Sequence, residues 1–342
     1  MISILTFLGC NRGEDKEHLF AEIVYADSEI FIDAEKLVDP RFMVIANDLF
    51  VVGNFKHDPL IEVYELSSKK LRNSFLNIGN GPNEVLTIGN VQYISSERKL
   101  LVADLHKKRM FGYTLDEDLL KMDNPQPTII YEREERSSYL FDKLYVGDDN
   151  LLAESRDTKG RVLLLDKSGN AIGYFLGYPD KKNVDKSLGD YNNAELYASA
   201  ITVSPSLNKM ALATYSAGMI DICEIKQDSI IPVWNYTDFY PQGIMVVPMG
   251  DNTAVAHTSK SRNGFTSISS SDKFIYALFS GKLLEDKTYP YGNEVYVVSW
   301  DGEKTYKILL DKSINRLAVD PEDEYIYGIT PEMDIVRFKI PK

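Results

Sequence analysis

Residues that could carry out chemistry are few and scattered in this chain of 342 residues. The stretch "NIGNGPNEV", residues 77 to 85, holds a Gly-x-Gly of the kind that cradles phosphates, but Glu84 stands where a dinucleotide-binding fingerprint has its third glycine. Such a site also needs a helix N-terminus after the glycines, whereas the following "VLTIGNVQYI" has the composition of a strand. We therefore interpret the stretch as architecture. Gly79 and Gly81 then supply backbone angles that other residues resist, Pro82 stiffens the turn, and Glu84 accepts backbone hydrogen bonds.

The remaining motifs do not define an active site. The histidines show no spacing of a metal-ligand pair and are predicted to lie on the surface or in loops: His18, His57, His106 and His257. Two Ser-x-x-Lys matches fall in polar turns, at Ser67 to Lys70 and Ser206 to Lys209. Asp301 and Gly302 are interpreted as a hairpin turn. No cofactor is predicted, and the alternative left open is a calcium ion held by acidic side chains in a central channel.

The two cysteines have different predicted roles. Cys223 lies in the apolar alternation "MIDICEI" and is predicted to be a buried, inert thiol. Cys10 ends the apolar run "MISILTFLGC" and is followed by polar residues, which resembles the end of a bacterial lipoprotein signal peptide. Either the start codon has been placed too late or the apolar terminus arose by chance. We favour the first interpretation, in which residues 1–20 are a truncated signal and tether, and Cys10 carries lipid.

The overall charge excludes one class of function. The net charge of −13 argues against nucleic-acid binding, because phosphate contacts need a clustered basic surface.

One pattern recurs along the chain: an apolar pair, a short polar turn, and an apolar run that ends in a small residue. It occurs at residues 44–53, 93–103, 145–154, 202–213, 267–277 and 318–328. The spacing of about 50 residues is typical of propeller blades, and each unit continues with two further apolar stretches around a second turn. No apolar stretch has helical spacing over the roughly 10 to 12 residues that a helix connecting parallel strands needs, which argues against a βαβ fold. The chain is therefore predicted to be an all-β, six-bladed β-propeller of four-stranded antiparallel blades over residues 21–342.

The last unit is one strand short. Its missing strand can come from "AEIVYA" (21–26) or "SEIFID" (28–33), which have no other unit to join. A strand from the start of the chain would close the ring and avoid an exposed sheet edge.

Several stretches carry a family resemblance over nearly the whole chain after residue 20. They are "IGNGPNEV", "FIYALFSGKLL" with "EVYVVSWDG", and "LAVDPEDEYIYGI". In these the sequence resembles the TolB-like six-bladed β-propeller lipoproteins of Gram-negative bacteria, although Asn83 stands where the family commonly has Gly. The resemblance implies a propeller fold, export from the cytoplasm and anchoring to the outer membrane by lipid. By analogy with TolB it also implies binding of another protein or a cell-envelope component.

Loop length separates the two faces of the predicted disc. The turns within the first and second hairpins of each unit are short, whereas insertions gather in the connections between units and in the loops from second to third strands. Long connections on a rigid scaffold are where binding residues accumulate. The candidate ligand-binding residues on this long-loop face are Asn80, Glu84, Tyr178, Lys182, Tyr191, Arg262, Tyr289 and Tyr291.

These observations together favour a monomeric, non-catalytic binding propeller of the cell envelope, with an envelope protein or a glycan as its partner. The alternative is a carbohydrate-active hydrolase or lyase with carboxylates converging at the axis. Three or more acidic side chains at the channel mouth would favour the enzyme, and an aromatic, carboxylate-poor mouth would favour binding.

Overall fold

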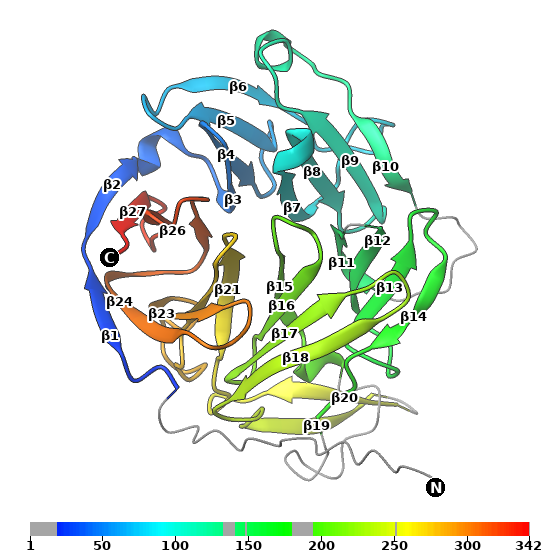
Figure 1. Cartoon of the computed structure of the whole chain (residues 1–342), viewed down its shortest axis with the longest axis vertical. Coiled ribbons are helices and arrows are strands. Elements are labelled where there is room, and N and C mark those ends of the chain that lie inside the picture. Colours follow the sequence, from blue (N-terminus) through cyan, green and yellow to red (C-terminus); the bar gives the residue numbers. More distant parts are fainter. Residues whose placement is uncertain (1–18, 133–140, 148, 180–193, 250–251, 342) are drawn as a thin grey trace, which may run out of the picture.

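A computed structural model describes residues 19–132, 141–147, 149–179, 194–249 and 252–341. In it, six small antiparallel sheets stand around a common axis like blades (Figure 1). The six repeated patterns each form the hairpin of the two innermost strands of a blade, as predicted.

The strands of the six blades follow one another along the chain. Blade 1 contains β3 (Pro40–Ala46), β4 (Leu49–Asn54), β5 (Ile61–Glu65) and β6 (Leu71–Phe75). Blade 2 contains β7 (Ile88–Ile94), β8 (Lys99–Asp104), β9 (Arg109–Thr114) and β10 (Thr128–Glu132). Blade 3 contains β11 (Phe141–Val146), β12 (Asn150–Ser155), β13 (Val162–Asp166) and β14 (Ala171–Phe175). Blade 4 contains β15 (Ser199–Val203), β16 (Lys209–Thr214), β17 (Met219–Ile225) and β18 (Ile230–Thr237).

Blade 5 contains β21 (Phe265–Ser270), β22 (Phe274–Phe279), β23 (Gly292–Ser299) and β24 (Thr305–Ile314). Blade 6 contains β25 (Leu317–Val319), β26 (Tyr325–Ile329) and β27 (Ile335–Lys339). In the described parts of the chain, three short 3₁₀ helices lie in connections: η2 (Ala34–Lys36), η3 (Ser95–Glu97) and η4 (Leu119–Lys121).

Both N-terminal segments are used in the sheets. Strand β2 (Ser28–Ile32) pairs antiparallel with β27 and is the outermost strand of blade 6. The prediction that an N-terminal strand completes the last blade is therefore confirmed for residues 28–32. Strand β1 (Ile23–Ala26) instead pairs in parallel with β24 as a fifth strand of blade 5, an arrangement that the strand patterns did not predict.

The apolar core consists of layers between neighbouring blades. Phe31 of β2 and Tyr327 of blade 6, for example, pack against Phe50 of blade 1, with ring centroids 5.0 Å and 5.2 Å apart for Phe31–Phe50 and Phe50–Tyr327. Both faces of a blade are covered in this way, so an inner strand such as β4 is buried along its whole length. This explains why the second strands read as continuous apolar runs rather than as alternating ones.

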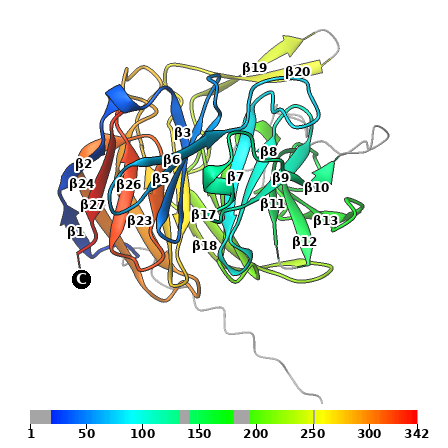
Figure 2. The same cartoon turned by 90° about the horizontal axis from the view of Figure 1, so that it is seen from above.

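The connection between blades 4 and 5, residues 238–264, was expected to be a long loop without strands. It contains a separate two-stranded hairpin, β19 (Ile244–Met249) and β20 (Asn252–His257). One side of this hairpin packs on a small cluster that includes Leu196, Tyr197 and Met219. Because the hairpin follows the fourth strand of one blade and precedes the first strand of the next, it belongs to the long-loop face, and Figure 2 shows it extending beyond the disc there.

Candidate binding site

A cavity of about 360 Å³ lies on the axis of the disc. Its lining comes from the innermost strands of all six blades, namely β3, β7, β11, β15, β21 and β25, and from residues next to them. This volume is that of a small-molecule site. The innermost strands all run from the long-loop face toward the short-turn face, so the cavity extends along the axis between the two faces.

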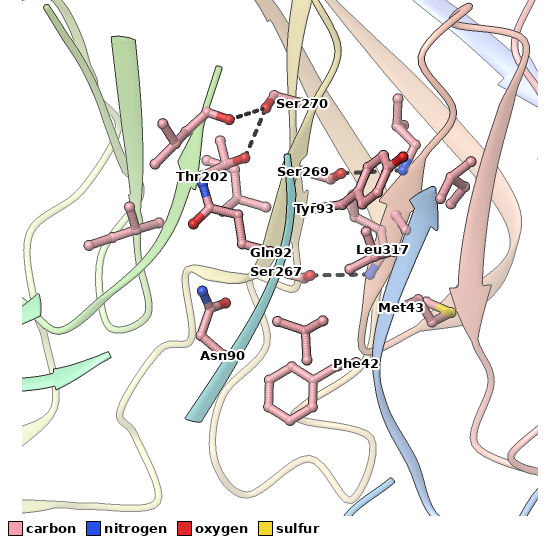
Figure 3. Close-up of a pocket in the computed structure, with 18 of the residues that line it drawn as sticks. Phe42, Met43, Asn90, Gln92, Tyr93, Thr202, Ser267, Ser269, Ser270 and Leu317 are labelled. Atoms are coloured by element: carbon pink, nitrogen blue, oxygen red, sulfur yellow. Dashed lines mark hydrogen bonds between the residues drawn. The ribbon is translucent and has the colours of Figure 1, made fainter. Parts of the chain in front are cut away.

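Many polar side chains in this lining hold neighbouring blades together. Ser267 and Ser269 of blade 5 accept hydrogen bonds from the backbone N of Leu317 and Val319 of blade 6, at 3.1 Å and 3.3 Å (Figure 3). The hydroxyl groups of Thr202 in blade 4 and Ser270 in blade 5 form a hydrogen bond, with their oxygens 2.9 Å apart. These hydroxyls therefore have a structural role in the lining.

Gln92 performs the same task between blades 2 and 3. Its amide nitrogen donates to the carbonyl of Val146 at 2.9 Å, and its amide oxygen accepts from the backbone N of Val146 at 2.8 Å. The side chain thus reproduces the hydrogen bonds of a neighbouring strand.

The charged groups of the lining are unevenly placed. Arg41, at the start of β3, and Arg316, just before β25, lie at the long-loop end, and Asp272, in the turn after β21, lies at the short-turn end. Asp272 is the one acidic residue among the described residues that line the cavity. The long-loop end is therefore locally basic in a chain whose net charge is −13.

The two arginines differ in their partners. Arg41 donates from Nε to Oδ1 of Asp39 at 3.1 Å and stacks on Phe55, with its Cζ 5.5 Å from the ring centroid. Arg316 donates from Nη1 to the carbonyl of Asn315 at 2.8 Å. Within the described parts of the chain, no carboxylate forms an ion pair with Arg316.

Burial between the blades disfavours the charged form of Arg316. Burial lowers the pKa of its guanidinium and the like charge of Arg41 lowers it further, while the nearby hydroxyls of Tyr215 and Tyr291 oppose that effect. The residue is half-buried and lines the cavity. A negatively charged ligand would relieve both unfavourable influences.

The structure bears directly on the loop 77–85. The backbone N of Gly81 donates to Oε2 of Glu84 at 2.6 Å, as predicted for Glu84. Lys107 Nζ donates to the carbonyls of Gly79, Gly81 and Glu84 at 2.8, 3.3 and 3.0 Å. The prediction of unusual backbone angles at the two glycines is wrong, since neither has a positive φ. A Cβ on Gly79 would lie 2.0 Å from Oε2 of Glu84, so the requirement there is space for the carboxylate.

The structure gives several predicted binding residues a part in the scaffold. The Tyr178 hydroxyl donates to the carbonyls of Asp157 and Gly160 at 2.8 and 3.2 Å, and burial raises the pKa of Tyr178 to about 12. Arg262 donates from Nε to the carbonyl of Gly281 at 3.1 Å, and its Cζ lies 4.2 Å from the ring centroid of Phe239. These side chains hold long loops in place.

The other candidates are dispersed. Asn80 is exposed, and Tyr289 and Tyr291 are half-buried next to the start of β23. Of this group, Tyr291 is the residue near Arg316. Lys182, Tyr191 and the lipidation candidate Cys10 lie outside the described residues. Their roles stay predictions.

Sequence reasoning missed Arg41 and Arg316. A signal was present, because the repeat places Arg41 four residues before its anchor Ile45 and Arg316 three residues before its anchor Val319. Both positions stand at the long-loop end of a first strand, but alternation does not single them out, because offsets of four and three residues point to opposite sides of a strand.

The remaining sequence expectations concern thiols and histidines. Cys223 is fully buried, which confirms the prediction of a buried thiol, and burial raises its pKa to about 12. That the thiol is inert stays a prediction. Three histidines, His57, His106 and His257, are exposed, as expected. Among the described residues, no group of three or more His, Cys, Asp or Glu side chains is placed to hold a metal ion. None of the described helices has the length and apolar character needed to cross a membrane.

The fold is that of a six-bladed propeller with an axial cavity. Comparison with protein families agrees, since the model described as "TolB-like 6-blade propeller-like" matches residues 20–322. The chain therefore belongs to the TolB-like six-blade propeller family. Proteins of this family are typically found outside the cytoplasm. No curated protein matches the sequence significantly.

Solved structures show the same fold at low sequence identity. A protein from Bacteroides fragilis NCTC 9343 described as a "Putative exported protein" aligns with TM-score 0.53 and 12% identity, over 94% of this chain and 100% of that one. The Cps50 (Swd1) β-propeller domain of Myceliophteria thermophila aligns with TM-score 0.52 and 10% identity, over 89% and 96% of the two chains. At such identities these likenesses concern the fold alone.

Proposed function

We propose that this protein is a non-catalytic binding propeller of the cell envelope, anchored to the outer membrane by lipid on Cys10, and that it binds an envelope protein or glycan on its long-loop face. Membership of a family that typically lies outside the cytoplasm supports the location. The placement of the long connections and of the β19–β20 hairpin on one face supports the site.

The observation that carries the proposal is the axial cavity of about 360 Å³ with its basic long-loop end. It joins apolar surface from Phe42, Val91 and Ile268 to a small number of directed polar groups. That combination is typical of binding sites, in which apolar walls bury the ligand and polar groups orient it.

The composition of the lining favours binding over carbohydrate cleavage. A glycosidase that acts through carboxylates needs two of them flanking the scissile bond, and among the described lining residues Asp272 is the single acid. Asp272 lies at the short-turn end, away from the arginines. The proposed activity therefore uses no acid–base pair of carboxylates.

The face can be tested by a matched pair of substitutions. Asn80→Arg changes an exposed amide on the long-loop face, and Gln227→Arg changes an exposed amide in the turn between β17 and β18 on the short-turn face. Proteins and glycans recovered from envelope extracts should decrease with Asn80→Arg and not with Gln227→Arg. Equal recovery with both variants, or a decrease confined to Gln227→Arg, would contradict the proposed face.

Anchoring has a separate test. The protein is expressed from its own upstream sequence, and the mass of its N-terminal peptide is measured beside that of the Cys10→Ser variant. A diacylated or triacylated cysteine in the first and an unprocessed N-terminus in the second are expected. An unmodified, cytoplasmic product from the unaltered gene would contradict the lipoprotein proposal.

A further inference from the structure

The chemistry at the long-loop end of the axial cavity narrows the kind of ligand that fits it. Resting on the proposed function, we propose that Arg316 is the recognition residue of this cavity and that it binds the carboxylate of a small organic acid, with Arg41 as a supporting charge.

Arg316 retains unused capacity for hydrogen bonding toward the cavity. A guanidinium carries five N–H donors in a planar fork, and among described residues the guanidinium of Arg316 has one acceptor, the backbone carbonyl of Asn315 at 2.8 Å. The residue is half-buried and lines the cavity. A planar carboxylate matches this fork with two parallel hydrogen bonds.

Charge balance favours a monoanion. Arg41 already pairs with Asp39, Nε to Oδ1 at 3.1 Å, so the positive charge that lacks a described carboxylate partner at this end is that of Arg316. The burial that lowers the pKa of Arg316 and the like charge of Arg41 both disfavour its charged form. One carboxylate offsets one uncompensated guanidinium, whereas a dianionic phosphate would bring excess negative charge into a chain whose net charge is already −13.

The walls next to the arginines fit the body of such an acid. Phe42 and Val91, from β3 and β7, are apolar and only partly buried, so they present surface to the cavity (Figure 3 labels Phe42). Asn90, from the start of β7, adds an amide nearby. A sugar acid and an acylated amino acid both join a carboxylate to a body of suitable size, and the experiment distinguishes these two sources.

The experiment uses the full chain and calorimetric titration at low salt with matched pairs of probes. Galacturonate is compared with galactose, and N-acetylphenylalanine with its amide, so that each pair differs in the carboxylate. Inorganic phosphate is the fifth probe. Binding of one acid, with at least tenfold weaker binding of its neutral partner, is expected. The acid that binds identifies a polar or an apolar body.

Variants assign the binding to Arg316. Loss of a charge-assisted hydrogen bond typically costs about 1.5–3 kcal/mol, so Arg316→Gln should weaken the acid roughly 10- to 100-fold, and Arg41→Gln by a smaller factor. Arg72→Gln is the control, because Arg72 has a similarly half-buried side chain but pairs with Glu65 and Glu117 away from the cavity. It should leave binding unchanged. Circular dichroism and thermal unfolding establish that each variant is folded.

Other outcomes overturn the assignment. If no carboxylate probe binds the folded wild-type chain, if phosphate alone binds, or if Arg316→Gln and Arg72→Gln have equal effects, Arg316 is not a carboxylate-recognition residue. If Arg316→Gln does not fold, the wild-type chain is titrated with the acid that binds, in the presence of excess acetate as a competing carboxylate. An affinity that acetate does not change would contradict the proposal. The envelope capture with Asn80→Arg is independent of these titrations, so failure of the carboxylate site and failure of the proposed face are distinguishable.

Discussion

The guanidinium of Arg161 lies 2.6 Å from the carboxylate of Asp221, measured from Nη1 to Oδ2, and this ion pair ties blade 3 to blade 4. Arg161 precedes β13, Asp221 lies in β17, and their side chains are 4% and 17% exposed. Nη2 of Arg161 also donates to Ser199 and Thr214 of blade 4 at 3.2 Å and 3.1 Å. The described partners of this buried charge thus all belong to the neighbouring blade, while its Nε is buried without a hydrogen-bond partner among the described residues.

Removing one partner of this pair should destabilise the protein strongly. Asp221→Asn leaves the buried Arg161 charge without its carboxylate, which typically costs on the order of 3 kcal/mol. The free energy of unfolding in denaturant measures the loss. Arg72→Gln, which breaks more exposed pairs with Glu65 and Glu117, should cost less than about 1 kcal/mol. Equal losses would show that the Arg161–Asp221 pair does not hold the two blades together.

The close approach of Glu84 to Gly79 makes a second prediction. Gly79→Ala places a Cβ 2.0 Å from Oε2 of Glu84, so the carboxylate must move and lose its hydrogen bond from the backbone N of Gly81, which should cost about 1–3 kcal/mol in unfolding free energy. Gly177→Ala is the control, because a Cβ there meets nothing within 4 Å. Adding Glu84→Ala to Gly79→Ala removes the clash and should recover part of the loss. If the two glycine variants unfold at the same denaturant concentration, the space around Glu84 is not what requires Gly79.

Closure by the N-terminal strand can be tested within β2 itself. Phe31 is 2% exposed and packs against Phe50 of blade 1 and Tyr327 of blade 6, whereas the preceding Ile30 is 47% exposed. Phe31→Ala should cost about 3–5 kcal/mol because it leaves a cavity between the first and last blades. Ile30→Ala should change the unfolding free energy by less than about 0.5 kcal/mol. Similar values for the two variants would contradict a structural role of β2 in closing the disc.

The buried thiol of Cys223 predicts a dependence on alkaline pH. Burial raises its pKa from 9.0 to about 12 in the folded chain. Below pH 9 both states hold the proton and the contribution to stability is complete. Above it the unfolded chain releases the proton first, so the contribution is lost as pH rises from 9 toward 12. Unfolding free energies measured between pH 8 and 11 should therefore fall, and less steeply for Cys223→Ala than for the wild type.

The same thiol should be unreactive in the native state. In a Cys10→Ser chain, where Cys223 is the remaining cysteine, a thiol reagent at pH 8 should modify Cys223 only as fast as the protein opens, and at once in denaturant. Rapid modification of the native chain would show that Cys223 is accessible.

The blades could be predicted from the sequence because their signals are local. Each innermost hairpin repeats one pattern around a short turn, and residues 28–32 were a candidate for the missing strand because they had no other partner. The Glu84 contact followed from the same local reasoning. The hairpin β19–β20 was missed although the sequence has an apolar stretch on either side of "GD", since it interrupts the repeat rather than continuing it.

The site could not be predicted in the same way. Tyr178 and Arg262 had suitable chemistry and a place on the long-loop face, but tertiary contacts with Asp157 and Phe239 give them a structural part. Arg41 and Arg316 are 275 residues apart in the sequence. They lie close together only because blades 6 and 1 are neighbours around the axis.

Alternation, turns and repeat length by themselves determined an all-β propeller, because hydrogen bonding within a blade joins strands that are neighbours in sequence. Which polar side chains stitch the blades and which face the cavity was decided only by the tertiary structure. Burial and charge at the axis depend on six innermost strands at once, and each of these strands belongs to a different blade. A local sequence pattern therefore describes one wall of the cavity at a time.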